Sequence, residues 1–113
     1  MAQWKEITTN EEWEQLFAAT TEQPIVVLKH STACSISFIA LEESEAYLSK
    51  TPNPDVEYVL VKVIESRPVS NQIAEDTGLR HVSPQLLYIK NKEVVWDASH
   101  WNINEKRMTA ALN

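Results

Sequence analysis

The sequence is poor in cysteine, in glycine and in long apolar segments. Cys34 is the only cysteine among 113 residues, which rules out a disulfide within the chain and fits a reducing compartment. Gly78 is the only glycine, which argues against a loop-rich or low-complexity architecture. No apolar run approaches the roughly 18–20 residues that cross a bilayer, so we expect no membrane as a partner.

Positive charge is also scarce. Ten Lys and Arg residues stand against 16 Asp and Glu residues, which gives a formal net charge of −6. Because binding phosphates requires clustered Lys and Arg, nucleic acid is not an expected partner. The N-terminal residues lack the apolar core of a signal peptide, and together with the lone thiol this predicts a cytoplasmic location.

The length and composition of the chain predict one globular domain spanning residues 1–113. Its length suits a single core, and its apolar fraction of 43 % is ordinary for folded proteins. The expected strands cover Trp4–Ile7, Ile25–Lys29, Glu57–Ile64, Gln85–Lys90 and Glu93–Asp97. The expected helices cover residues 11–19, Ser35–Lys50, Arg67–Thr77 and Asn102–Asn113.

This alternation of strands and helices predicts an α/β fold. We expect a central mixed sheet, mostly parallel, with helices on both faces. A tight turn at Asn91-Lys92 makes the last two strands an antiparallel hairpin at one edge. Thr9 or Asn10 caps the first helix, and Gly78 ends the third helix as a left-handed cap.

Side-chain periodicity predicts which faces are buried. On the first helix, the inner face carries Trp13, Leu16 and Phe17. On the second helix, we expect an inner stripe that contains Ile36, Ile39, Ala40, Tyr47 and Leu48. The tryptophans Trp13, Trp96 and Trp101 are expected to pack in or around the core.

Cys34 lies between an expected buried strand and the helix that follows it, and this position affects the reactivity of the thiol. Unpaired N–H groups and the helix dipole at a helix start stabilise a thiolate, which is the nucleophilic form of cysteine. The alternative is that a lone cysteine simply serves as a small buried hydrophobe. The strand-loop-helix context favours the reactive thiol.

Ser37 follows Cys34 at a spacing that brings the two side chains together in the first helical turn. Two cysteines at this spacing form a dithiol redox motif. Because the second residue here is serine, the protein cannot resolve a mixed disulfide by itself. It must pass its adduct to another thiol, which makes exchange through a mixed disulfide the natural reaction.

Ser83-Pro84 directly precedes an apolar strand, where proline is unusual because it cannot donate to the strand ladder. A cis Ser83–Pro84 bond explains this placement, and an ordinary trans turn proline is the alternative. In the expected topology this loop faces the loop that carries Cys34. The backbone of Ser83 is then placed to pair with an extended thiol peptide.

The two histidines nearest these motifs have simpler interpretations. His30 is expected to close the strand before the thiol, although as a cation it would favour the thiolate. His81 is expected to make structural hydrogen bonds in its loop. The spacing of Cys34, His30 and His81 matches no zinc motif, so no metal site is predicted.

The stretches IVVLKHSTACSIS and TGLRHVSPQLLYI resemble the thioredoxin superfamily over almost the whole chain. More narrowly, the chain resembles the YtxJ family of monothiol, bacilliredoxin-like proteins from bacteria that make bacillithiol. That family carries T-C-P-I-S and H-x-S-P-Q segments. They correspond here to residues 33–37 and 81–85.

This resemblance implies a reaction and its participants. Cys34 would take bacillithiol from a bacillithiol-capped client protein and release the reduced client. A second bacillithiol, or a partner disulfide reductase, would regenerate Cys34, with bacillithiol as co-substrate and no bound cofactor. Ser83 and Pro84 would form the substrate-binding loop.

Two positions next to the thiol depart from the family pattern. Ala33 stands in place of Thr, which removes a hydroxyl able to contact substrate. Ser35 stands in place of Pro and keeps a backbone N–H, which either adds a donor to the sulfur or changes how the helix begins. Both residues flank Cys34 and are therefore substrate-binding candidates.

Two further functions compete with the oxidoreductase. A thioredoxin-fold binding module would hold client peptides at the proline loop and leave Cys34 unreactive or dispensable. A thiol sensor would use the same reactive thiol but would be modified stoichiometrically, without catalytic turnover.

Overall fold

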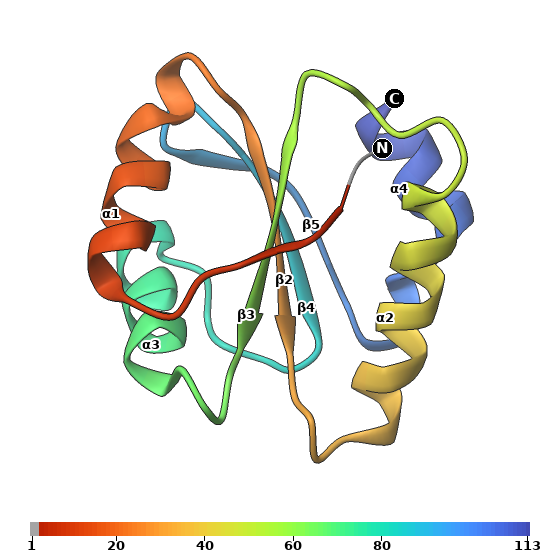
Figure 1. Ribbon diagram of the computed structural model, residues 1–113, viewed down its shortest axis with the longest axis horizontal. Coiled ribbons are helices and arrows are strands. Elements are labelled where there is room, and N and C mark those ends of the chain that lie inside the picture. Colours follow the sequence, from red (N-terminus) through yellow and green to blue (C-terminus); the bar gives the residue numbers. More distant parts are fainter. Residues whose placement is uncertain (1–2) are drawn as a thin grey trace.

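The computed structural model describes residues 3–113, which form one five-stranded sheet between two layers of helices. The strands are β1 (Lys5–Glu6), β2 (Ile25–His30), β3 (Glu57–Lys62), β4 (Gln85–Lys90) and β5 (Glu93–Ser99). The helices are α1 (Asn10–Ala18), α2 (Ser35–Leu48), α3 (Arg67–Thr77) and α4 (Glu105–Leu112). In Figure 1, α1 and α3 cover one face of the sheet, and α2 and α4 cover the other.

The sheet is mixed and has the order β1-β3-β2-β4-β5. The pairings β1–β3 and β2–β3 are parallel, whereas β2–β4 and β4–β5 are antiparallel. The expected central mixed sheet with its C-terminal antiparallel hairpin is thus confirmed, but parallel pairings make up two of the four rather than most of them, because β4 is antiparallel to β2 as well as to β5. Each expected strand and helix is present, with bounds that differ by a few residues.

Strand β2 is the centre of the molecule, and all of its six residues are buried. Because successive side chains of a strand point to opposite faces, Val26 and Leu28 pack into the core under α2 and α4. Ile25 and Val27 pack into the second core, under α1 and α3. A strand with helices on both faces needs apolar residues at successive positions, which accounts for the run IVVL.

Local signals set the ends of the helices and the hairpin as expected. The Thr9 hydroxyl accepts a hydrogen bond from Glu12 N–H at 3.2 Å, and the Glu12 carboxylate accepts from Thr9 N–H at 3.2 Å, a capping box that begins α1. Gly78 ends α3 with a φ of 70°. Asn91 and Lys92 both adopt positive φ, 51° and 61°, which fits the two-residue turn between β4 and β5.

Helix α2 buries Ala40, Tyr47 and Leu48 as expected and differs from the expectation at Ile39. Ile39 is 41 % exposed, so the prediction that it belongs to the inner stripe is wrong. The buried residues of α2 are Ser37, Ala40, Ser44, Tyr47 and Leu48. The N-terminal half of this face carries small side chains, and the bulky Ile39 is left on the solvent side.

The last helix begins later than expected, at Glu105 rather than Asn102. The side chain of Asn104 accepts a hydrogen bond from Arg107 N–H at 2.9 Å and so caps α4. Residues His100–Asn102 form a separate 3-10 turn instead. Trp101 on this turn is 62 % exposed, so its predicted packing around the core is wrong, whereas Trp13 is fully buried.

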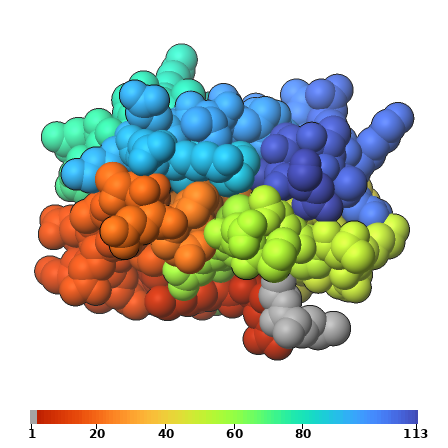
Figure 2. All heavy atoms as spheres, turned by 90° about the horizontal axis from the view of Figure 1, so that it is seen from above, coloured from red at the N-terminus to blue at the C-terminus, as the bar shows by residue number. Residues whose placement is uncertain are grey.

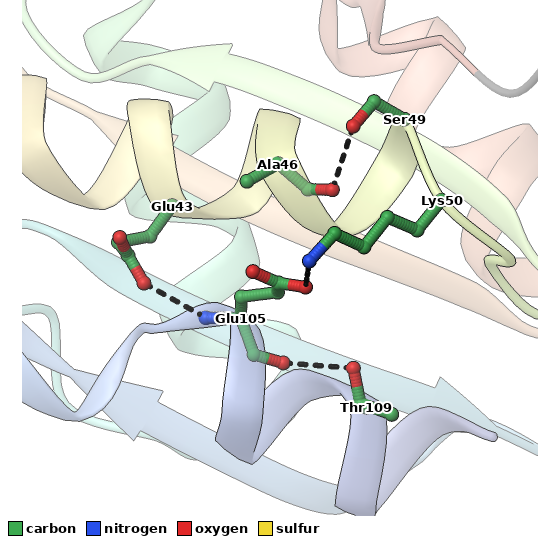
Figure 3. A network of polar contacts seen from close by, with 6 residues as sticks. All are labelled: Glu43, Ala46, Ser49, Lys50, Glu105 and Thr109. Atoms are coloured by element: carbon green, nitrogen blue, oxygen red, sulfur yellow. Dashed lines mark hydrogen bonds and ion pairs between the residues drawn. The ribbon is translucent and has the colours of Figure 1, made fainter.

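Polar contacts join α4 to α2 along the outer part of their interface (Figure 3). The Glu43 carboxylate accepts from the backbone N–H of Glu105 at 3.1 Å, at the start of α4. The Glu105 carboxylate in turn pairs with the Lys50 ammonium. These contacts hold α4 beside α2 in addition to the apolar core.

At the end of the molecule that Figure 2 shows from above, the segment before β3 and the C-terminal segment lie side by side. There the Gln23 amide donates to the Asp55 carbonyl at 2.8 Å, and the Asn53 amide donates to the Leu112 carbonyl at 2.7 Å.

Residues 3–113 contain no helix with the length and apolar character needed to cross a membrane.

Candidate active site

The loop between β2 and α2 is shaped by its own hydrogen bonds. The Cys34 N–H donates to the Ser31 carbonyl at 3.3 Å, and the Ala33 N–H donates to the Ser31 hydroxyl at 3.4 Å. The Val63 N–H donates to the His30 carbonyl at 2.9 Å, which extends the β2–β3 pairing to the edge of this loop. The chain therefore leaves β2 in a tight turn that places Cys34 directly before α2, at its N-cap.

Cys34 is the N-cap residue of α2, and its side chain is partly exposed. The backbone N–H of Ser37 makes the largest contribution to lowering the pKa of the Cys34 thiol. The Ile36 N–H and the Ser37 hydroxyl also lower this pKa. Partial burial opposes this shift. The thiol makes no side-chain capping hydrogen bond, so these donors act on the charged sulfur as nearby dipoles.

Ser37 joins the two loops of the site. Its side chain is fully buried, and its hydroxyl accepts a hydrogen bond from the Ser31 N–H at 3.2 Å. The same oxygen lies 3.5 Å from the Ser83 hydroxyl, which comes from the loop before β4. The structure thus brings together the thiol turn and the proline loop, as the sequence predicts.

The Ser83–Pro84 peptide bond is cis, which confirms the explanation suggested by a proline at this strand start. Pro84 is buried, and its carbonyl accepts a hydrogen bond from the His100 N–H at 3.2 Å. The 3-10 turn that carries the exposed Trp101 therefore lies directly beside the proline loop. Nothing in the sequence pattern had placed this turn near the site.

Ala33 and Ser35 flank the thiol on the surface, and both are exposed. No hydrogen bond described for residues 3–113 joins either of them to Ser83 or Pro84. The N–H groups that lower the pKa of the Cys34 thiol belong to Ser37 and Ile36 rather than to Ser35. The two flanking residues are therefore exposed neighbours of the thiol in the sequence.

The histidines take structural positions. His30 is buried in β2, paired in register with Lys62, and burial lowers the pKa of its imidazole. It closes the strand, as expected. His81 makes structural hydrogen bonds, also as expected. Within the described part of the chain, no group of three His, Cys, Asp or Glu residues is arranged to hold a metal ion.

One functional candidate escaped the sequence reasoning. Lys29 is fully buried, although its sequence context suggested only the last residue of an apolar strand. Its ammonium lies 3.2 Å from Nδ1 of His81, two residues before Ser83. A lysine inside an otherwise apolar run was the available signal, and its partner is 52 residues away in the sequence.

The fold and the single thiol at the start of α2 define a class: thioredoxin-fold proteins that work with one cysteine. A structure of a candidate oxidoreductase with a thioredoxin fold superimposes with a TM-score of 0.80 at 30 % identity, covering 94 % of this chain and 90 % of that one. Thioredoxin from Fasciola hepatica gives a TM-score of 0.72 at 20 % identity, with 94 % and 93 % of the two chains covered. Thioredoxin from Malassezia sympodialis gives 0.74 at 21 % identity, with 98 % and 89 % covered.

The sequence model of the family described as monothiol bacilliredoxin BrxC matches residues 5–108. The chain belongs to this family, and the resemblance seen in the sequence is confirmed. It is a monothiol thiol-disulfide oxidoreductase of the thioredoxin fold, and its one cysteine fits the monothiol chemistry of the family.

Proposed function

We propose that this protein removes bacillithiol from client proteins that carry it as a mixed disulfide, with Cys34 as the nucleophile. One observation supports the assignment of Cys34 above all others. The thiol is partly exposed at the N-cap of α2, where backbone N–H groups lower the pKa of the thiol. A site with this geometry raises the thiolate fraction and leaves the sulfur open to a second sulfur.

The first step is an exchange between two sulfurs. The Cys34 thiolate attacks the bacillithiol sulfur of the client's mixed disulfide, forming a new S–S bond and breaking the old one. The client's cysteine leaves as a thiolate and takes up a proton from water. The client is thereby reduced, and Cys34 carries the bacillithiol.

Regeneration requires an external thiol because Ser37 occupies the position where a resolving cysteine would lie. A second bacillithiol thiolate attacks the bacillithiol sulfur on Cys34, releases the Cys34 thiolate and leaves bacillithiol disulfide. A partner disulfide reductase is the alternative route. Bacillithiol is therefore a co-substrate rather than a bound cofactor.

The surroundings of the thiol support binding of an extended client segment. The hydroxyl of Ser83 lies 3.5 Å from that of Ser37, so the proline loop lies beside the thiol turn, where an extended peptide would pair with the Ser83 backbone by strand addition. Ala33 and Ser35 are exposed on either side of Cys34 and would contact the substrate there. We place the reaction in the cytoplasm, since a free thiol that works by exchange needs a reducing compartment.

The test follows the transfer of bacillithiol from the client protein to this protein. A client protein capped with bacillithiol is mixed with the purified protein, and both are followed by intact mass spectrometry. We expect the client to lose the cap while this protein gains it. Replacing Cys34 with serine is expected to slow transfer by at least about a thousandfold, since an alcohol does not form an S–S bond.

The control is a variant with a changed side chain beside the thiol and an unchanged sulfur, Ser35→Ala. It should still remove the cap. A client that stays capped while Cys34 stays free would refute the proposed activity and favour the binding module. Stoichiometric capping of Cys34 without turnover in excess bacillithiol would favour the thiol sensor instead.

A further inference from the structure

Lys29 is a buried cation without a neighbouring carboxylate. Its side chain is fully buried, and none of the ion pairs described for residues 3–113 involves it. The ammonium donates to the Ser70 carbonyl at 3.0 Å and lies 3.2 Å from Nδ1 of His81. Charged groups are rarely buried unless their interactions are needed, so this lysine calls for an explanation.

The contact defines the state of His81. Burial lowers the pKa of Lys29 to about 8, so the amine is mostly charged at neutral pH. An ammonium has hydrogens to donate and no lone pair, so Nδ1 of His81 must accept. His81 is therefore neutral and carries its proton on Nε2. The Ser70 hydroxyl, 3.4 Å from the same Nδ1, adds a second partner from α3.

His81 belongs to a loop with little other support. Among the described backbone–backbone hydrogen bonds outside helices and strands, none involves residues 79–83. Side chains hold this loop instead. The Gln85 amide donates to the Arg80 carbonyl at 3.0 Å, Lys29 contacts His81, and the Ser37 hydroxyl meets that of Ser83. Removing one of these contacts should therefore loosen the loop locally.

We propose that Lys29 is a positioning residue whose buried ammonium holds neutral His81 and, through it, keeps Ser83 in register across from Cys34. This inference rests on the proposed function, because it assigns the loop a role in binding the capped client. Lys29 itself is too buried to touch substrate. Its role is to fix the shape of the surface that the substrate meets.

The proposal has a pH dependence with a defined sign. The charged groups that act on His81 are Lys29 from β2 and Arg67 from α3, both positive, and they lower the pKa of the imidazole together with burial. Protonation at acid pH removes the acceptor and places a third positive charge there. The contact is therefore intact above the ordinary histidine pKa of about 6.5 and is lost as the pH falls through the lowered pKa of His81, below that value.

The test uses Cys34→Ser protein, which binds but cannot react, so ionisation of the thiol does not enter. A bacillithiol-capped peptide is titrated by fluorescence anisotropy, and hydrogen exchange is measured for the amides of residues 79–83. His81→Leu and Lys29→Met remove the contact. His81→Asn keeps an acceptor oxygen near the place of Nδ1 and does not titrate. Lys62→Met, a partly exposed lysine of the neighbouring strand, is the matched control.

We expect His81→Leu and Lys29→Met each to weaken peptide binding by about tenfold or more, the effect of losing one charge-assisted hydrogen bond. The double variant should be no worse than either single variant, because both remove the same contact. Hydrogen exchange of the amides of residues 79–83 should become faster, whereas amides in the core should stay protected. His81→Asn should bind like the parent and should not show the weakening that the parent shows as the pH falls through the lowered pKa of His81.

Unchanged affinity and unchanged loop exchange in His81→Leu and Lys29→Met would overturn the proposal, even if the unfolding midpoint falls. A His81→Asn variant as weak as His81→Leu would overturn it too. A parent that does not bind the capped peptide would instead contradict the proposed function, and loop exchange would still show whether Lys29 fixes the loop.

Discussion

Replacing Ser37 with cysteine is expected to convert the protein from a carrier of bacillithiol into a dithiol enzyme. Residue 37 lies in the first turn of α2, and its side chain acts on the Cys34 sulfur. A thiol at this place attacks the Cys34 sulfur of the capped intermediate and expels bacillithiol. The attack is intramolecular, so release of the cap should be at least about a hundredfold faster than with free thiol.

Intact mass decides the outcome of this substitution. The wild-type protein should accumulate the bacillithiol adduct. Ser37→Cys should instead accumulate a form that is lighter than its own reduced form by two hydrogens, because Cys34 and the introduced thiol are joined as a disulfide. Ser35→Cys adds a thiol at the exposed neighbouring position and should keep the adduct on Cys34. A persistent adduct in Ser37→Cys would contradict the placement of residue 37 beside the sulfur.

Trp13→Ala is expected to cause the largest loss of stability among the substitutions considered. Trp13 is fully buried, stacks on Phe17 with ring centroids 5.0 Å apart, and donates from its indole N–H to the Asp76 carboxylate at 2.8 Å. Truncating such a side chain costs about 3–5 kcal/mol. Since small domains are stable by only about 5–15 kcal/mol, this is a large part of the total.

Urea unfolding followed by circular dichroism measures this effect. Trp101→Ala is the matched control, because the same residue type at 62 % exposure should change the free energy of unfolding by less than about 0.5 kcal/mol. Equal losses in the two variants would contradict the assignment of Trp13 to the core under α1 and α3.

The parts of the fold that the sequence predicts are those that local chemistry determines. A run of apolar β-branched residues predicts β2, Gly78 predicts the end of α3, and Asn91-Lys92 predicts the hairpin. The inner face of α2 is predicted only in part, because it depends on how the helix packs on the sheet. Hydrophobicity alone favoured Ile39, whereas in the structure Ser37 and Ser44 are buried on that face and Ile39 is exposed.

In the candidate site, too, some features follow from the sequence and others depend on tertiary packing. The order of strands predicts that the thiol turn meets the proline loop, and the contact between Ser37 and Ser83 agrees with it. The link between Lys29 and His81 joins residues 52 apart in the sequence, and no local pattern encodes it. Which N–H groups act on the sulfur likewise depends on the three-dimensional course of the first helical turn.

The most direct test of the central claim is to titrate the Cys34 thiolate by its ultraviolet absorbance and to measure cap transfer over the same pH range. The account predicts a pKa below the ordinary value of about 8.5 and a transfer rate that rises along the same curve. Ser37→Ala should move both curves to higher pH, and Ser35→Ala should move neither. A thiol pKa at or above the ordinary value, or a transfer rate independent of the thiolate fraction, would contradict the account.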